Sequence, residues 1–326
     1  MGTLNTTRAV DIDVQGSQDM SNLAGRSGVA PGVTYYVNNI TGSASNDGLS
    51  WNTPFAQVST AITASEAYRL ALAANNTFVR NTIIIQGTAT RYTALTALPN
   101  WTNVVGVGAD PRGNGSGIVR IGSASGADGV TGSGGATDMR GVNWYNIQFN
   151  AGGNYYACHF PVAYRCRFEN CTFGCADDNA TAHGGLYIES GSGVVLKDCA
   201  TIHHSGTLVT GVTVGNSGGN FNECKITDCV FQGSTAGFLN SAYLCNNSVM
   251  QNCVVNGGTN GIVDTSTETT LLGNMYYVGN FCYGSQSTGA NAGGMKVTNN
   301  PTLRCIGNKC NDAGTGHEYN TIVGSS

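Results

Sequence analysis

Five phrases of four residues, each opening with Asn or Asp, recur along the chain: Asn146–Phe149 (NIQF), Asn170–Phe173 (NCTF), Asp198–Thr201 (DCAT), Asp228–Phe231 (DCVF) and Asn252–Val255 (NCVV). Their starts are 24, 28, 30 and 24 residues apart. Two looser copies, Asn280–Tyr283 and Asn308–Asn311, follow at further steps of 28 residues. A recurrence every 24 to 30 residues is typical of a solenoid, in which each repeat packs on the one before.

A second phrase, glycine followed by a short apolar stretch, runs in step with the first: Gly185–Ile188, Gly211–Val214, Gly237–Asn240, Gly261–Asp264 and Gly294–Val297. The segments are short, rich in Val, Ile, Phe, Tyr and Thr, and bounded by Gly, Asn, Asp and Ser, which is the chemistry of strands and turns. There is neither a leucine framework nor room for a helix in each repeat. The pattern predicts a parallel β-helix with two or three strands per coil. At ~4.8 Å per coil, roughly nine coils give a rod of about 45 Å.

Bulk composition excludes several classes of function. Of 326 residues, 47 are glycine and only 10 % are charged, with a formal net charge of −4. A nucleic-acid binder would need a basic surface, so we expect no nucleic-acid partner. No stretch approaches the ~20 apolar residues of a membrane span, so we expect no membrane partner. Residues 1–32 show no secretion signal, so we expect a chain that is made in the cytoplasm and is not exported by a signal peptide.

The twelve cysteines admit three interpretations. A disulfide framework suits small secreted domains. A metal site is suggested by one cluster: Cys158, His159, Cys166, Cys171 and Cys175. Its five-residue spacing matches no common zinc pattern, so we expect no metal and no cofactor. The third interpretation, which we favour, is that reduced cysteines are small core residues stacked from coil to coil. Four share one place in the repeat (Cys171, Cys199, Cys229 and Cys253), and three others each precede a repeat cysteine by five residues (Cys166, Cys224 and Cys305).

Two parts of the chain fall outside the period. Residues 1–32 form either an unstructured end or an arm that becomes ordered against a partner. The second alternative is suggested by Val10, Ile12 and Val14, which alternate with acidic residues as in a strand that adds to the sheet of another chain. We treat residues 33–326 as one β-helix domain. Residues 112–140, rich in Gly, Ser and Ala, read as a long surface excursion. A last strand is expected over residues 318–323, with another subunit covering the end of the coil.

The residues that precede the repeats carry a family resemblance. Tyr35–Asn38 (YYVN), Thr41–Ser43 (TGS), Asn46–Trp51 (NDGLSW) and Thr53–Phe55 (TPF) resemble the opening of right-handed parallel β-helix proteins of the pectin-lyase-like superfamily. In that family an amphipathic helix then plugs the first coil. Residues 55–74 fit such a helix, with an apolar stripe available from Val58, Ile62, Ala67, Leu70 and Leu72. Residues 82–87 and 104–111 resemble the family's first strands, and the likeness spans residues 34–320.

The resemblance implies the fold more strongly than an activity, because the superfamily includes lyases, hydrolases, epimerases and parts of virions. We expect a non-enzymatic structural protein of a bacteriophage virion: a head fibre, a capsid decoration or a short tail-fibre subunit. It would be a homotrimer made in the host cytoplasm, attached to other virion proteins through residues 1–32, and able to contact host or environmental glycans. One alternative is a polysaccharide-degrading enzyme, a tailspike-type lyase or glycosidase. A second is a carbohydrate-binding module.

Candidate catalytic residues are few. Enzymes on this scaffold place carboxylates, often with a basic residue, on the outer face of one sheet, and a glycosidase needs a pair of carboxylates. The best acidic group is Asp177, Asp178 and Glu189, with His183 between them and Arg165 before them. The two aspartates lie in a turn context, where acids serve the backbone. This scarcity is our reason for preferring a structural role.

Other polar and aromatic residues have simpler interpretations. Asp198 and Asp228 align with the repeat asparagines and are expected to be turn residues in a polar ladder. Asn240 and Asp264 take the place of apolar residues in the glycine phrase, so we expect the strand to bend there. In the pairs Tyr155-Tyr156 and Tyr276-Tyr277 we expect one ring to be buried and one exposed, because successive residues of a strand face opposite sides. His203-His204 is expected to be an exposed pair in a turn, and on a strand at most one of the two could line a site.

Overall fold

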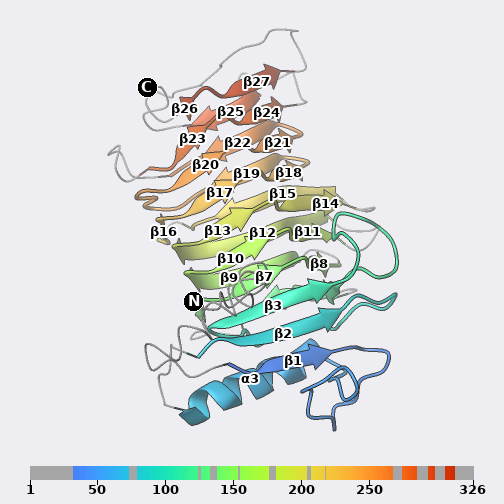
Figure 1. Ribbon diagram of the computed structural model, residues 1–326. Helices are drawn as coiled ribbons and strands as arrows, with labels where there is room; N and C mark the ends of the chain where they lie inside the picture. Colours follow the sequence, from blue (N-terminus) through green and yellow to red (C-terminus); the bar gives the residue numbers. More distant parts are fainter. Residues whose placement is uncertain are drawn as a thin grey trace, which may run out of the picture.

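The strands of this chain wind into a right-handed parallel β-helix, as predicted. The computed structural model describes residues 32–72, 79–123, 126–132, 138–152, 155–175, 181–203, 207–216, 218–266, 274–284, 293–297 and 305–312. The N-terminal arm, His204 and the strand expected over residues 318–323 lie outside these residues. Figure 1 shows the coils stacked from the helix-capped end to the C-terminal end.

Three parallel sheets form the walls of the rod. Sheet A has ten strands: β1 (Thr34–Val37), β2 (Asn81–Gln86), β3 (Thr102–Val107), β7 (Asn143–Tyr145), β10 (Arg167–Glu169), β13 (Val195–Lys197), β17 (Lys225–Thr227), β20 (Val249–Gln251), β23 (Tyr276–Val278) and β26 (Cys305–Ile306). Sheet B has eight: β4 (Arg120–Gly122), β8 (Gln148–Ala151), β11 (Thr172–Cys175), β14 (Ala200–His203), β18 (Val230–Gly233), β21 (Val254–Gly257), β24 (Phe281–Gly284) and β27 (Lys309–Asp312). The ten levels of sheet A slightly exceed the nine coils expected.

Sheet C has nine strands: β5 (Val130–Thr131), β6 (Met139–Arg140), β9 (Tyr156–Tyr164), β12 (Thr181–Ser192), β15 (Thr207–Val214), β16 (Phe221–Asn222), β19 (Ala236–Asn240), β22 (Asn260–Asp264) and β25 (Gly293–Val297). The expectation that residues 112–140 form only a surface excursion was therefore wrong. Short strands β4, β5 and β6 from this segment pair with β8 and β9, because the coil needs backbone partners even where apolar side chains are scarce.

In-register pairing stacks equivalent side chains over one another and thereby builds the core. Phe149 lies opposite Phe173 in sheet B, and their rings stack 5.6 Å apart. In sheet C, Val212 pairs with Phe238 and Phe238 with Ile262, all fully buried. Because each inward row is continuous from coil to coil, the core runs the length of the rod.

The bend between sheets A and B is a column of residues with left-handed backbone. Five of the positions are the repeat residues, with φ between 48° and 57°: Asn146, Asn170, Asp198, Asp228 and Asn252. This confirms the expected ladder of turn residues, since Asn and Asp tolerate this conformation better than other L residues. Gly279 and Gly307, with φ of 62° and 63°, take the next two places. The two looser copies of the repeat are therefore displaced by one residue, and Asn280 is the equivalent of Cys253.

The residue after each bend faces the core, and there the cysteines do more than fill space. The backbone N–H of Cys199 donates to Sγ of Cys229 on the next coil, at 3.4 Å. Further along, the N–H of Cys253 donates to Oδ1 of Asn280, at 3.0 Å, and that of Asn280 to Oδ1 of Asn308, at 2.9 Å. In these three pairs the later coil supplies an acceptor for a buried amide of the coil before it, and the acceptor is either a sulfur or an amide oxygen.

The second bend column repeats this arrangement with other side chains. The N–H of Val194 donates to Sγ of Cys224, at 3.4 Å, and the N–H of Cys224 donates to Oγ of Ser248, at 3.0 Å. The eleven cysteines whose side chains the structure describes are free thiols, and burial raises the pKa of Cys166 to about 11. Cys305, in β26, pairs with Tyr277 and is not the equivalent of Cys166 or Cys224, because the five-residue spacing breaks at the displaced repeats.

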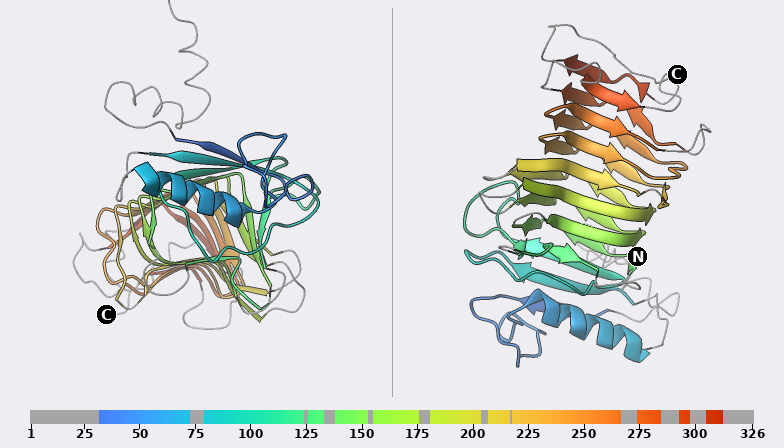
Figure 2. Two further views of the ribbon diagram at one scale, coloured as in Figure 1. Left: turned by 90° about the horizontal axis from the view of Figure 1, so that it is seen from below. Right: turned by 180° about the vertical axis from the view of Figure 1, so that it is seen from behind.

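Helix α3 (Val58–Leu72) covers the N-terminal end of the coil, as the left view of Figure 2 shows. Its buried face consists of residues spaced 3, 4 and 7 apart: Val58, Ala61, Ile62 and Ser65. The predicted stripe was therefore only half right, since Leu70 and Leu72 are 50 % and 44 % exposed. The helix also begins later than expected, because hydrogen bonds to Tyr36 and Asn38 hold Phe55 extended beside β1.

Asn240 and Asp264 correct a further expectation. Their strands do not bend, because the register continues from Val214 to Asn240 to Asp264. Both side chains point into the core and are fully buried. Asn240 Nδ2 donates to Asp264 Oδ2, at 3.1 Å, and the Tyr277 hydroxyl donates to the same oxygen, at 2.7 Å. Ser266 completes the network with two hydrogen bonds to Oδ1 of the aspartate. A polar network has thus replaced apolar packing in these coils.

Candidate functional site

The structure does not bring the predicted catalytic group together. Asp177 and Asp178 lie outside the described residues, and so does the side chain of His183. Arg165 is exposed at a bend, beside Gly193 and with its guanidinium 5.1 Å from the ring centre of Tyr164. Gly193 follows Glu189 by four residues, which at ~3.3 Å per residue is roughly 13 Å along the chain. Only Glu189 has partners that suggest a site, and Arg165 is not among them.

The partners of Glu189 gather around His159, on the outer face of sheet C. Nε2 of His159 lies 2.7 Å from Oε1 of Glu189, and Nδ1 lies 3.3 Å from Oδ2 of Asp128. The other oxygens of both acids are also bound: Oε2 of Glu189 accepts from Nδ2 of Asn216, at 3.1 Å, and Oδ1 of Asp128 accepts from the N–H of Tyr156, at 2.8 Å. All four carboxylate oxygens therefore have a partner within the protein.

Strand alternation and register place these groups. On β9, Cys158 and Phe160 point into the core and are fully buried, so His159 between them points outward. Because sheet C is in register, His159 lies directly beside Tyr187 of β12. Their rings stack with centroids 4.9 Å apart and planes 13° apart. The same alternation separates Cys158 from His159, so the cysteine–histidine cluster cannot form one metal site.

Tyr156 completes an aromatic surface by covering a glycine. Gly184 is its register partner, and a Cβ at that position would lie 2.7 Å from Cε1 of Tyr156. The space left by the absent side chain lets the Tyr156 ring approach Tyr187, with centroids 5.1 Å apart, and His159, with centroids 5.6 Å apart. We call Tyr156, His159 and Tyr187, with Asp128, Glu189 and Asn216, the sheet C cluster.

Hydrogen bonding favours the cationic form of His159. Both ring nitrogens face carboxylate oxygens, which accept hydrogen bonds, so both nitrogens can donate only when the ring is protonated. Burial on its own would lower the pKa of His159, but the hydrogen bonds and charges of Asp128 and Glu189 outweigh burial, so the pKa lies above its ordinary value of 6.5. The side chain is 25 % exposed, and those of Asp128 and Glu189 are 17 % and 30 % exposed. The cluster is thus an ordered, partly open surface.

A second charged group lies on the outer face of sheet A. Glu169 accepts from Arg167, at 2.8 Å, and from Lys197, at 3.1 Å. Burial would raise the pKa of Glu169, but these two cations lower it below its ordinary value. The acid is balanced by its neighbours, as in a surface ion-pair group.

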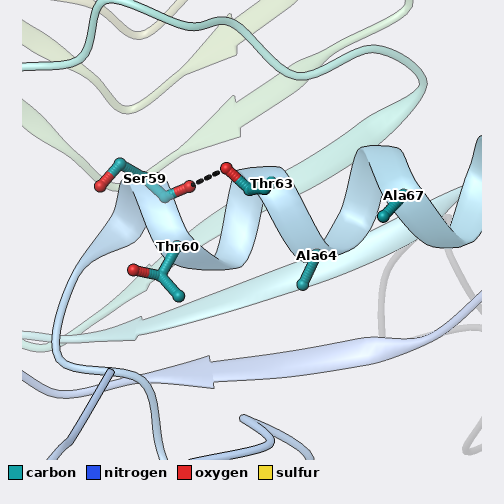
Figure 3. Close-up of a pocket in the computed structure, with 5 residues that line it drawn as sticks. All are labelled: Ser59, Thr60, Thr63, Ala64 and Ala67. Carbon is teal, nitrogen blue, oxygen red and sulfur yellow. Dashed lines mark hydrogen bonds between the residues drawn. The ribbon is translucent and has the colours of Figure 1, made fainter. Parts of the chain in front are cut away.

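Beside the capping helix there is a shallow hollow of about 370 Å³. Figure 3 shows its lining of small side chains: Ser59, Thr60, Thr63, Ala64 and Ala67. The Thr63 hydroxyl donates to the carbonyl of Ser59, at 3.0 Å. No titratable group lines the hollow, so its chemistry is limited to shape and a few hydroxyls.

The remaining predictions about single residues have mixed outcomes. Tyr277 is fully buried and Tyr276 half-buried, as alternation requires, whereas Tyr155 is 39 % exposed and Tyr156 is half-buried rather than buried. Within the described residues, no helix is long and apolar enough to cross a membrane. Among the same residues, no group of three or more His, Cys, Asp or Glu side chains is arranged to hold a metal ion.

Comparison with known proteins assigns the chain to no family. No protein-family model matches the chain, and no curated protein does. Among solved structures, the chain is similar to a pectin methylesterase from Aspergillus niger, with 16 % sequence identity over 91 % of each chain and a TM-score of 0.44. The β-helix assignment comes from the strand pairing of this chain itself.

Proposed function

We propose that this chain is a non-enzymatic structural protein of a bacteriophage virion, a head fibre, capsid decoration or short tail-fibre subunit, and that it contacts glycans through the sheet C cluster. The subunits form a homotrimer and attach to other virion proteins through residues 1–32. The stiff β-helix body and its column of buried reduced thiols support a structural role for a chain made in the host cytoplasm. Residues 34–55 resemble the opening of proteins of the pectin-lyase-like superfamily. That superfamily includes parts of virions, which supports the virion assignment.

The observation that carries the glycan contact is the half-exposed ring surface of Tyr156, His159 and Tyr187. Aromatic faces held in fixed positions offer apolar contact to the C–H faces of sugars, while neighbouring polar atoms fix orientation. The neighbouring carboxylates face the imidazole of His159 from its two sides and each already holds two partners. A glycosidase instead needs one acid free to donate a proton and one free to attack or to activate water.

The test is a glycan array followed by incubation of the bound glycans with the protein. We expect binding without release of reducing ends or of 4,5-unsaturated products. Tyr187→Ala should remove binding, whereas Tyr243→Ala, which changes a tyrosine that is 47 % exposed outside the cluster, should not. Binding that persists in the Tyr187 variant, or the absence of any glycan ligand, would contradict the proposed contact.

A polysaccharide-cleaving enzyme is the second candidate, and one observation favours it: the aromatic surface includes His159, a group that can carry a proton and lies between two carboxylates. If product appears in the incubation, His159→Gln, Asp177→Asn and Asp178→Asn identify the residues responsible. Cleavage that any of these three changes abolishes would replace the structural proposal with the enzymatic one.

The virion assignment needs its own experiment. Antibodies raised against the chain should label purified particles at the head or the tail in immunogold electron microscopy. Antigen found only in the soluble fraction of the lysate would reject the virion role and leave a free carbohydrate-binding module.

A further inference from the structure

We infer that the sheet C cluster takes neutral or amine-bearing sugars and rejects uronic acids. This inference rests on the proposed glycan contact and adds the chemical class of the ligand. It follows from the charge of the cluster, from the direction in which its polar atoms point, and from where the nearest cations of the described chain lie.

The cluster has a net negative charge. In its protonated form His159 contributes one positive charge. Asp128 and Glu189 contribute one negative charge each, and Asn216 is neutral. The sum is −1 with His159 protonated and −2 with it neutral, and the charges lie on three adjacent coils.

The polar atoms that a ligand would meet there are mainly acceptors. When His159 is protonated, the protons on both of its nitrogens are engaged, so the ring has no further donor to offer. The carboxylate oxygens of Asp128 and Glu189 have one partner each and room for a second, since an ionised carboxyl has about four lone-pair sites. Hydroxyl and ammonium groups of a sugar can donate to these oxygens. The carboxylate of a uronic acid only accepts, so it would bring a like charge beside Asp128 and Glu189 and could meet only neutral donors such as Nδ2 of Asn216.

Three described cations, Lys296, Arg140 and Lys197, are too far away or already paired. Lys296 shares the outward row of sheet C, but it lies four strands beyond Tyr187, which at ~4.8 Å per strand is roughly 19 Å. The Debye length at physiological salt is about 8 Å, so Lys296 contributes little. Arg140 pairs with Asp138, and Lys197 pairs with Glu169 on sheet A. None of these offsets the charge of the cluster.

The experiment is a titration of the full chain with three oligosaccharides of matched length: chitin oligomers (neutral), chitosan oligomers (cationic) and oligogalacturonate (anionic). At physiological salt we expect binding of the first two and none of the third. Adding salt should weaken only the chitosan complex. Only in that complex does an ammonium group of the ligand attract the carboxylates of the cluster, and added salt screens this attraction. Glu189→Gln should lower the preference for chitosan over chitin about fivefold, the size of one exposed charge interaction. Glu223→Gln, which removes an exposed acid outside the cluster, should leave the preference unchanged.

A gain-of-function variant guards against misfolding as an explanation. Asn216→Lys places an ammonium group beside Glu189 and should create measurable binding of oligogalacturonate. If oligogalacturonate binds the unmodified chain and Tyr187→Ala abolishes that binding, the inference about charge is wrong while the proposed function stands. If none of the three oligomers binds, nor any glycan on the array, the proposed function fails as well. A preference that Glu189→Gln and Glu223→Gln reduce equally would assign the selectivity to overall charge and overturn the inference.

Discussion

At the scale of single residues, the bend columns explain why cysteine is so common in this chain. A left-handed turn leaves the next backbone N–H pointing into the core, where an unpaired donor costs about 1–3 kcal/mol. Sγ of Cys229 and Oγ of Ser248 both meet such a donor on the coil before them. The residue must therefore be small, fit among apolar neighbours and accept a hydrogen bond, and cysteine meets all three requirements.

Cys229→Val tests this role, because valine fills the space but accepts no hydrogen bond. We expect a loss of about 1–3 kcal/mol in the free energy of unfolding, measured by urea denaturation. Cys229→Ser keeps an acceptor, as Ser248 does in the other column, and should lose less than half as much. A serine variant less stable than the valine variant would show that apolar packing, rather than the amide acceptor, is what the cysteine provides.

His159→Gln tests how much the ion pairs of His159 with Asp128 and Glu189, which join neighbouring coils, stabilise the protein. The folded protein raises the pKa of His159 above 6.5, so its stabilising effect is fully present below about pH 6.5 and is lost as the pH rises through the higher folded-state value. We expect the variant to be about 1 kcal/mol less stable than the unmodified chain at pH 6, and the difference to shrink by pH 9. Urea denaturation at both pH values measures it. Glu223→Gln should show no such pH dependence between pH 6 and pH 9.

Part of the candidate site could be predicted from sequence and part could not. Glu189 was predicted, and alternation on one strand is enough to place His159 outward when Cys158 and Phe160 are core residues. The lateral pairing of His159 with Tyr187 needs the register, which repeats of unequal length leave open. Asp128 belongs to a glycine-rich segment without a period, so no pattern in the sequence connects it to His159.

At the scale of elements, the capping helix depends on one polar anchor more than on its predicted apolar stripe. Oδ1 of Asn81 accepts from the N–H of Val33, at 2.9 Å, and Nδ2 donates to the carbonyl and the hydroxyl of Ser65, both at 2.9 Å. Asn81 is 1 % exposed. One side chain thus ties β1, β2 and α3 together at the end of the rod.

Asn81→Ala removes all three hydrogen bonds and leaves their partners buried. We expect a loss of about 2–4 kcal/mol in the free energy of unfolding, with α3 becoming the first segment to exchange amide protons. Hydrogen exchange followed by mass spectrometry measures both. Asn114→Ala, in an exposed loop, should change stability by less than about 0.5 kcal/mol. Unchanged exchange in α3 would mean that the apolar contacts of Val58 and Ile62 hold the helix without the anchor.

Sheet B shows why elements were harder to predict than the fold. The loop before β4 crosses its outer face, and the carbonyl of Pro111 accepts from Gln148, at 2.7 Å, and from Thr172, at 3.0 Å. Arg112 reaches the carbonyl of Asp198 on a later coil. Pro111 is separated from Thr172 by 61 residues. Such a contact depends on side chains whose sequence pattern is that of ordinary strand and loop residues, so it could not be predicted. The repeat that determines the fold, in contrast, can be recognised in the sequence alone.

At the scale of the whole molecule, the two ends of the rod differ. Helix α3 covers the N-terminal end, whereas β25, β26 and β27 are the last strands of their sheets within the described part of the chain. Exposed strand edges favour association. The proposed homotrimer predicts a mass of about three times the 33.7 kDa of one chain in light scattering at micromolar concentration. A stable monomer under these conditions would contradict the proposed trimer and leave the β-helix assignment intact.

The hydrogen bonds of the bend columns also give the folding of the rod an order, from the N-terminal coil to the C-terminal coil. A ribosome releases the coils in order from the capped end, and the amides of Cys199, Cys253 and Asn280 must each wait for a side chain that has not yet been synthesised. While these coils are being made, the last coil of the nascent rod therefore has a backbone N–H without its final acceptor. Water must accept this hydrogen bond until the next coil is made. Each new coil then stabilises the coil before it by accepting these hydrogen bonds. A stalled or truncated chain should therefore unfold first at its most recently made coil.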